Sequence, residues 1–340
     1  MDRPATLASA SITRPDKDKT ILPTLAVVVI ARNEEENIGA SLDAALAAVC
    51  GQDCSEVVLV DSDSSDRTVE IAQQYPISIL RYRAKRPTAA AGRRIGFAHV
   101  RASYVQFIDG DCCIEPGFIE AALLELASHS DVAAVYGARR NITPGQVPES
   151  VPIVHALLGG NALYRASALA QVDSFNPYII GEEEGELLGR LQAAGFRAVR
   201  IQNLMITHYT EAVQTVEGFL QRHHRGLGRG SGQVLRLSIK QGLFWYHARR
   251  LNRYLMTLMF ILLGLILVVA SLLARMPAPI FLWLSAALVA FVLLWAKRRS
   301  LRSAVFILAD WATVAWSMMR GFAQAPRLPI TFAPVVEKIK

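Results

Sequence analysis

Three apolar runs in the first third of this 340-residue chain are each followed by acidic side chains. The runs are residues 25–30 (LAVVVI), 56–60 (EVVLV) and 104–108 (YVQFI). Their β-branched residues are typical of strands that are buried on both faces of a parallel sheet. Helical segments separate them, so the sequence predicts an α/β fold in which strands and helices alternate. Ligands of such sheets bind beyond the carboxyl ends of the strands, so the acidic clusters at Glu34, Asp61 and Asp109 are expected to form one site.

The most informative cluster is Asp109-Gly110-Asp111. Two carboxylates on either side of a glycine can turn toward one ligand, and such hard oxygen ligands suit Mg²⁺ or Mn²⁺. A divalent ion held in this way commonly bridges a diphosphate, so the motif favours nucleotide chemistry. Because Asp-Gly-Asp also makes ordinary turns, it predicts a metal site only in combination with the other acidic strand ends.

Five blocks of sequence follow one another between about residues 25 and 230. They are VVVIARNEEENI (27–38), EVVLVDSDSSDRT (56–68), AAAGRRIGFAHVRASYVQFIDGD (89–111), GGNALYRASAL (159–169) and GEEEGELLGRLQAAGF (181–196). In this order and spacing the chain resembles the family 2 glycosyltransferases. The resemblance implies a GT-A fold, with a Rossmann-like nucleotide-binding domain and a mostly parallel sheet. It also implies an inverting transferase that uses a nucleotide-diphosphate sugar and a divalent metal, Mg²⁺ or Mn²⁺.

The resemblance further implies roles for individual residues. The residues that would contact the nucleotide sugar are Ala31, Arg32, Asn33, Glu34, Asp61, Arg93, Asp109, Gly160 and Asn161. Asp111 would bind the metal together with Asp109, and His208 is a further candidate ligand. Glu184 would be the catalytic base, because GEEEGELLGRL matches an acidic pair followed by an acidic residue, leucine and arginine.

The chain departs from the family pattern in three places. The family often has proline before the Asn-Glu run and glycine in the second loop, where this chain has Ile30-Ala31 and Asp63. The base position is more often aspartate than glutamate. These departures leave the fold prediction unchanged, and they leave the donor base and sugar open.

Four carboxylates between Glu182 and Glu186 have two interpretations. Acidic side chains are favoured at a helix N-terminus by the helix dipole, which would make the group a solvated helix end. A carboxylate is also a suitable general base for a sugar hydroxyl that attacks an anomeric carbon. Given the acidic strand ends, we favour the catalytic interpretation for Glu184, and a helper or solvated role for Glu183 and Glu186.

A basic stretch, RHHRGLGRG (222–230), follows these blocks. Arg222 and Arg225 are candidates to contact the donor diphosphate or the acceptor, because a guanidinium group binds phosphate through paired hydrogen bonds. The stretch is equally typical of a basic face before a membrane segment. Gly226 stands where processive members of the family have tryptophan, so the chain resembles a polymer synthase less closely.

Two uncharged apolar segments, residues 254–274 and 279–296, predict a transmembrane helical hairpin. The first is long enough to cross a hydrocarbon core of about 30 Å, and a buried core helix is the alternative for each. The composition favours membrane insertion, since 52% of the residues are hydrophobic and 19% are charged. Basic residues flank the hairpin at 249–253 and 297–302, whereas its connection contains only Arg275. The positive-inside rule therefore predicts a multi-pass inner-membrane protein with its catalytic domain in the cytoplasm.

A third apolar segment, residues 304–322, is ambiguous because it contains Asp310 and ends near Arg320. We expect an amphipathic helix in the plane of the membrane rather than a third span. A span would place the tail, residues 334–340, on the opposite side of the membrane.

The sequence as a whole predicts a membrane-anchored glycosyltransferase. The expected divisions are a polar leader (1–20), a nucleotide-binding half (21–140), an acceptor half (150–235), a basic juxtamembrane segment (236–253) and the hairpin (254–296).

The expected acceptor is a lipid-linked sugar in exopolysaccharide or cell-envelope glycan synthesis. A polyprenyl-phosphate monosaccharide synthase and a catalytically silent membrane scaffold are the alternatives. The net charge of +7 fits contact with anionic membrane lipids, and no nucleic-acid partner is expected because basic and aromatic residues are not interleaved.

Overall fold

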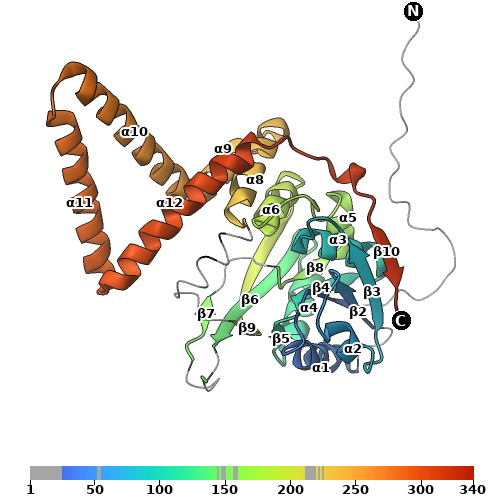
Figure 1. Ribbon diagram of the computed structural model, residues 1–340. Coiled ribbons are helices and arrows are strands. Elements are labelled where there is room, and N and C mark those ends of the chain that lie inside the picture. Colours follow the sequence, from blue (N-terminus) through green and yellow to red (C-terminus); the bar gives the residue numbers. More distant parts are fainter. Residues whose placement is uncertain are drawn as a thin grey trace, which may run out of the picture. The chain divides into compact units, whose positions relative to one another are not determined.

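The computed structural model describes residues 25–51, 55–143, 145–146, 151–155, 160–210, 220, 223 and 226–340. The predicted leader and the candidate residues Arg222 and Arg225 lie outside this part of the chain. The chain divides into two compact units. We call them the sheet unit (residues up to 179, 183–211 and 327–340) and the helical unit (180–182 and 212–326). The elements of both are labelled in Figure 1.

The sheet unit is built on one mixed sheet in the order β10-β3-β2-β1-β4-β8-β6-β9-β5, with β7 paired to β6. Its strands are β1 (Leu25–Ala31), β2 (Glu56–Asp61), β3 (Ser78–Arg83), β4 (Tyr104–Asp109), β5 (Cys112–Ile114), β6 (Val132–Ile142), β7 (Val154–His155), β8 (Leu163–Arg165), β9 (Arg197–Tyr209) and β10 (Val335–Lys338). Strands β3, β2, β1 and β4 are parallel neighbours. Antiparallel pairing adds β10 beside β3 and β8 beside β4.

Helices cover both faces of the parallel strands. They are α1 (Ile38–Val49), α2 (Thr68–Ala72), α3 (Ala89–His99), α4 (Phe118–Ser128), α5 (Ala166–Gln171) and α6 (Glu183–Ala193). Alternate residues of β1 belong to two separate hydrophobic clusters, one that includes Val27 and Val29 and another that includes Val28 and Ile30. Every β1 residue is therefore buried, which explains why the strand reads as a continuous apolar run.

The predicted α/β alternation is confirmed. Expected strands at 25–30, 56–60 and 104–108 correspond to β1, β2 and β4, and each extends one residue further, to Ala31, Asp61 and Asp109. The small residues of α3 have a packing reason, because a Cβ atom at Gly96 would overlap the side chain of Val28. Helix α3 thus lies close against β1, and this placement brings its preceding turn to the carboxyl edge of the sheet.

The helical unit contains α8 (Gly228–Gln241), α9 (Phe244–Arg250), α10 (Asn252–Ala274), α11 (Ala278–Arg298) and α12 (Leu301–Ala323). The backbones of α8 and α12 touch at glycines: a Cβ at Gly232 would overlap the carbonyl of Met318, and one at Gly321 would overlap that of Arg229. Helix α8 therefore groups with α12 in the helical unit. The sequence analysis had assigned its first half to the acceptor half of the glycosyltransferase domain, with a boundary near residue 235, and the structure differs there because of this close contact.

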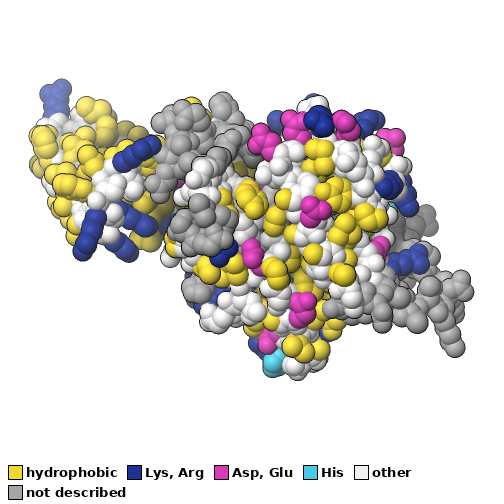
Figure 2. Space-filling view, turned by 90° about the horizontal axis from the view of Figure 1, so that it is seen from below, with side chains coloured by type: hydrophobic (Ala, Val, Ile, Leu, Met, Phe, Trp, Pro, Cys, Tyr) yellow, Lys and Arg dark blue, Asp and Glu magenta, His cyan; other side chains and the backbone are white. Residues whose placement is uncertain are grey.

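Helices α10 and α11 are long and apolar enough to cross a membrane, by length and composition. Only 11% of the most apolar window of α10 is buried, and none of that of α11. Side chains such as Leu273 and Leu282 are exposed, which argues against the alternative of buried core helices. Figure 2 shows this surface as almost uniformly apolar, with lysine and arginine side chains gathered beside it. Helix α12 does not pass the same test.

The segment after α12 returns to the sheet unit. Strand β10 pairs antiparallel with the outer strand β3, so that Val336 lies opposite Tyr82 (Figure 1). The ammonium group of Lys340 donates hydrogen bonds to the carbonyls of Gln73 at 2.7 Å and Tyr75 at 2.6 Å. Residues from both ends of the described chain therefore contribute strands to one sheet.

Candidate active site

The acidic clusters lie at one edge of the sheet because their strands are parallel and in register. Ala31 at the end of β1 lies opposite Asp61 of β2, and Ile30 lies opposite Asp109 of β4. The amide of Gly110 donates to the carbonyl of Ile30 at 2.8 Å, which holds the turn after β4 against β1. The structure thus brings together the three clusters that the sequence analysis expected to form one site.

Hydrogen bonds join the loops that follow β1 and β2. Asn33 has a left-handed backbone (φ 57°), and its side-chain oxygen accepts from the amide of Ser65 at 2.9 Å. Its own amide donates to Ser64 Oγ at 2.9 Å, and the amide of Glu34 donates to Thr68 Oγ1 at 2.8 Å. Asn33 therefore fixes the shape of this edge from an exposed position, where a ligand can also reach it.

Asp61 is fully buried at the end of β2. Its carboxylate accepts from the amide of Ser64 at 3.0 Å and from the Ser64 hydroxyl, and Arg81 on β3 approaches to 3.4 Å. These contacts attach the buried carboxylate to the loop after β2 and to β3.

The centre of the site is the guanidinium group of Arg93, which comes from α3 and is 2% exposed. It pairs with Asp109 at 2.7 Å, Glu183 at 2.9 Å and Glu184 at 3.5 Å. Burial by itself would lower the pKa of Arg93, but the charges of Asp109, Glu184 and Glu183 outweigh it and raise that pKa. The sequence analysis assigned Arg93 to donor binding; the structure shows it as the cation that joins β4 to α6.

Gly160 and Asn161 support this ion-pair cluster. A Cβ atom at Gly160 would overlap the Arg93 guanidinium, so only glycine leaves room for that side chain. Asn161 bonds Asp109 twice: its side-chain oxygen accepts from the Asp109 amide at 2.7 Å, and its amide donates to Oδ2 at 3.1 Å. Both residues contribute to the site by positioning Arg93 and Asp109.

Glu184, the candidate base, is in the first turn of α6, with a side chain that is 16% exposed. Burial and the adjacent charge of Glu183 raise the pKa of Glu184 to about 8, against the opposing effect of Arg93. A carboxyl group with such a pKa takes up and releases protons close to neutral pH, which suits general-base chemistry.

Of the two roles expected for Glu183 and Glu186, helper or solvated, the solvated one is wrong for both residues. Glu183 is 6% exposed and Glu186 is 1% exposed. Glu186 forms a two-point ion pair with Arg190, at 2.7 and 2.6 Å, and Arg190 also donates to backbone carbonyls of the preceding loop. The pair attaches α6 to that loop, and Glu183 shares the charge of Arg93. Helix-dipole reasoning considers the charge at the helix end and not these partners: Arg93 lies 90 positions before Glu183, whereas Arg190 lies one turn after Glu186 on the same helix.

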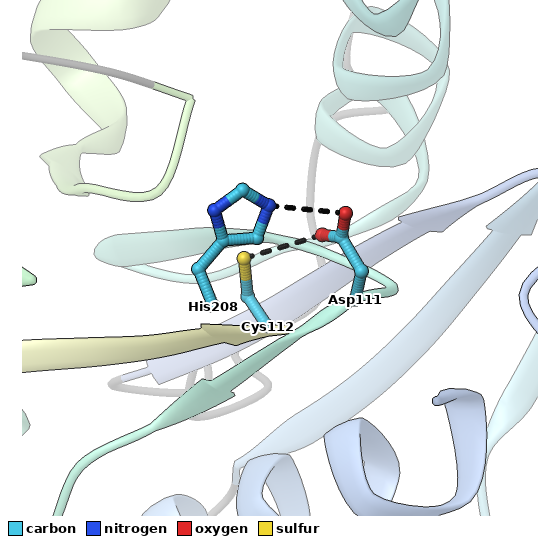
Figure 3. Close-up of side chains that lie close together, drawn as sticks. All are labelled: Asp111, Cys112 and His208. Atoms are coloured by element: carbon cyan, nitrogen blue, oxygen red, sulfur yellow. Dashed lines mark hydrogen bonds and ion pairs between the residues drawn. The ribbon is translucent and has the colours of Figure 1, made fainter. Parts of the chain in front are cut away.

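A second group of side chains lies just beyond β4 and is drawn in Figure 3. Strand β5 pairs with β9 so that Cys112 lies opposite His208. His208 Nε2 is 3.2 Å from Asp111 Oδ2, and the Cys112 thiol donates to Asp111 Oδ1 at 3.3 Å. Asp111, Cys112 and His208 are the cluster of possible metal ligands among the described residues, and Asp109 is not part of it.

The chemistry of this cluster fits a hard divalent cation held by Asp111 and His208. Burial acts to raise the pKa of Asp111, yet the hydrogen bond and charge of His208 lower it overall. Burial acts to lower the pKa of His208, and Asp111 raises it overall, so the pair already attracts positive charge. Burial raises the pKa of Cys112 well above its usual range, which keeps it a thiol and makes it a hydrogen-bond donor to Asp111.

One supporting residue of this group was not found from the sequence. Asn141 on β6 places its side-chain oxygen 3.2 Å from His208 Nδ1, and such a partner orients the other ring nitrogen toward Asp111. Only the parallel pairing of β6 with β9, in which Asn141 lies opposite His208, brings the two together. Ala31 and Arg32 lie at the same edge as this site, the former buried and the latter exposed.

Comparison with known proteins agrees with this geometry. Residues 26–172 match the family model described as Glycosyl transferase family 2. Residues 26–172 are therefore similar to a family 2 glycosyltransferase domain. The matched range includes β1, β2 and β4 with their acidic ends, and the described residues Gly160 and Asn161.

Two curated relatives come from Haloferax volcanii. One is the glycosyltransferase AglE, 29% identical over 103 residues, which are 29% of this chain and 34% of AglE. The other is the low-salt glycan biosynthesis hexosyltransferase Agl6, 33% identical over 155 residues, which are 43% of this chain and 34% of Agl6. The matches thus span about a third of the length of each relative.

Among solved structures, the mannosyltransferase PcManGT from Pyrobaculum calidifontis, in complex with GDP-Man and Mn²⁺, has the same fold. It aligns with a TM-score of 0.53 at 17% identity, over 91% of this chain and 90% of PcManGT. The GT-A fold that the sequence predicted is therefore confirmed.

Replacement of Arg93 by methionine is expected to destabilise the sheet unit. The carboxylates of Asp109, Glu183 and Glu184 would lose the buried cation that they share, at a cost of about 3–5 kcal/mol. Hydrogen exchange of β1 and β4 amides, measured by mass spectrometry on the full chain, should show a matching fall in opening free energy. Arg197→Met is the control, since it removes an exposed ion pair with Asp131 and should leave these amides unchanged. Equal protection in the two variants would contradict a structural role for Arg93.

Proposed function

We propose that this protein is a membrane-anchored, inverting glycosyltransferase that uses a nucleotide-diphosphate sugar. Its acceptor is a lipid-linked sugar in exopolysaccharide or cell-envelope glycan synthesis. The observation that carries the proposal is the arrangement around β4: Asp109 pairs with the cation that also holds Glu184, and two residues later Asp111 pairs with His208. A base and a cation site thus flank one turn of the chain, which is what transfer from a diphosphate requires.

The relatives support the donor and metal classes. Agl6 is described as a hexosyltransferase, and PcManGT was solved with GDP-Man and Mn²⁺. By analogy, Asp111 and His208 would hold Mg²⁺ or Mn²⁺ in this chain. When bound, the ion would supply positive charge to the diphosphate as it leaves. Asn33, Asp61 and the joined loops after β1 and β2 would bind the nucleoside.

Glu184 is the group that moves a proton in this proposal. Its carboxylate accepts the proton of the acceptor hydroxyl while that oxygen bonds to the anomeric carbon and the bond to the nucleoside diphosphate breaks. Attack from the face opposite the leaving group inverts the anomeric configuration. Arg93 keeps the carboxylate in place, and Glu183 raises its proton affinity.

The pH dependence of transfer tests the role of Glu184. Its pKa is raised to about 8, so the group is protonated, and unable to accept a proton, in most molecules at pH 6. The kcat is therefore expected to rise from pH 6 through pH 8 and to level off above. Glu184→Gln should lower kcat by about 10²–10⁴-fold and remove this rise. Glu120→Gln, an exposed carboxylate on α4, is the matched control. Full activity in Glu184→Gln would refute the assignment.

Metal binding tests the role of Asp111 and His208. Asp111→Ala and His208→Ala each remove a ligand atom, so the affinity for Mn²⁺ in the presence of nucleoside diphosphate should fall at least about tenfold. Calorimetry measures this affinity directly, and EDTA should abolish transfer by the unaltered chain. Asp131→Ala serves as control because that carboxylate is on the surface, in a pair with Arg197. Unchanged Mn²⁺ affinity in both site variants would place the ion elsewhere.

The tail strand supports a specific membrane topology. Strand β9 precedes the helical unit in sequence and β10 follows it, yet both belong to one sheet and must lie on the same side of a membrane. The chain between them crosses an even number of times. If α10 and α11 span the bilayer, α12 remains on the side of the sheet unit, as the in-plane interpretation expects. The basic residues at both outer ends of the hairpin favour the cytoplasm for that side.

Reporter fusions in a bacterial host test this topology. A fluorescent protein that matures only in the cytoplasm should fluoresce when fused after Lys340, and alkaline phosphatase fused there should be inactive. The same two reporters inserted after Met276, in the connection between α10 and α11, should give the opposite result. Active phosphatase after Lys340 would mean an odd number of crossings, and the pairing of β10 with β3 would then be impossible in the membrane.

A further inference from the structure

A cavity of about 300 Å³, lined by both apolar and polar side chains, lies within the helical unit. Its walls come from the segment 180–182, α8, α10 and α12. The polar side chains that line it include Glu182, Ser231, Tyr254, Asp310, Thr313 and Ser317. The volume is at the lower end of the range of ligand pockets, about 300–1,000 Å³. Such a concentration of polar groups is unexpected in a unit whose hairpin is almost wholly apolar.

The lining groups are suited to a ligand with many hydroxyls. The carboxylates of Glu182 and Asp310 accept hydrogen bonds, and the hydroxyls of the other lining residues can donate or accept. Thr313 donates its hydrogen to the carbonyls of Ala309 and Asp310, so its lone pairs face outward as acceptors. A sugar hydroxyl needs both kinds of partner, and Tyr254 adds a flat surface.

The same lining is unsuited to a phosphate group. The ionisable side chains among the described lining residues include two carboxylates and the imidazole of His223, with no lysine or arginine. Arg250 is close by, but it is engaged in an ion pair with Glu182. Among the described lining groups, a phosphate would meet the carboxylates of Glu182 and Asp310 and no guanidinium or ammonium group, which disfavours binding.

We propose that this cavity binds the glycosyl group of the acceptor. The inference rests on the proposed transferase function and makes it more specific. It favours a lipid-linked sugar over a polyprenyl phosphate as the molecule that receives the transferred sugar, because the receiving group is a hydroxyl-bearing ring.

The cavity wall and the proposed base are parts of one short segment. Glu182 has a left-handed backbone (φ 67°), an uncommon conformation for a residue with a side chain. The amide of Ile180 donates to Gln233 at 3.1 Å, and Gly230 lets α8 approach the carbonyl of Gly181 closely. Segment 180–182 is thereby fixed to the helical unit, and Glu184 follows two residues later in sequence.

The test uses the full chain in nanodiscs, so that no glycoside detergent competes. The probes are methyl glucoside, methyl galactoside, methyl mannoside and octyl phosphate, and saturation-transfer NMR measures binding. At least one glycoside is expected to bind, and Asp310→Asn and Thr313→Val should each weaken it about tenfold to hundredfold. The acceptor KM should rise by the same factor for the lipid-linked and the soluble form of the sugar, with kcat changed less. Glu120→Gln is the matched control for the change of a carboxylate to an amide.

Binding of nucleoside diphosphate with Mn²⁺, measured on each variant, checks that the sheet unit is folded. The proposal is overturned if no glycoside binds, if octyl phosphate binds and competes with the glycosides, or if both variants bind glycoside as the unaltered chain does. A different result would refute the transferase proposal: the protein would neither bind nor turn over any nucleotide sugar, whether or not it bound glycosides. Transfer that persists with an unchanged acceptor KM in both variants would refute the cavity alone.

Discussion

The guanidinium group of Arg93 is shared by carboxylates from two separate parts of the sheet unit, Asp109 at the end of β4 and the pair Glu183 and Glu184 on α6. Burial of the two glutamates beside the half-buried Asp109 would be strongly unfavourable without a shared cation. The shared cation also requires glycine at position 160, because a Cβ atom at Gly160 would overlap the guanidinium group. Helix α3 must also lie close against β1 to deliver Arg93. The packing of α3 against β1 therefore determines where the cation of the site lies.

Much of this arrangement was predictable because it is local in sequence. Continuous apolar runs that end in acidic residues predict parallel strands and a site at their carboxyl edge, and β1, β2 and β4 agree to within one residue. The burial of Glu186 and the role of Arg93 were not predictable in this way. Arg93 meets Glu183 across 90 positions of sequence, and β10 pairs with a strand some 250 positions earlier. Local patterns carry no information on contacts of this kind.

The pairing of β10 with β3 links the position of the tail to the membrane topology of residues 304–322. From the sequence, the in-plane or spanning state of 304–322 depends on hydropathy alone, which Asp310 and Arg320 leave ambiguous. A tail strand within the sheet adds a geometric condition that hydropathy does not contain. Asp310 then has a second reason to be present, because it lines a cavity of the helical unit together with several hydroxyl groups. A charged residue that would be costly in a span is favourable beside hydroxyl-bearing ligands.

The same burial that makes Arg93 necessary determines the proton affinity of the proposed base. Removal of water and the nearby charge of Glu183 raise the pKa of Glu184, and Arg93 prevents it from rising further. A carboxylate in water, with a pKa near 4, would be ionised but a weak base; one buried without a cation would remain protonated. The value of about 8 lies between these limits. Because a general base is most effective when its pKa is close to the working pH, one arginine can both stabilise the fold at this edge and tune the group that would accept the proton.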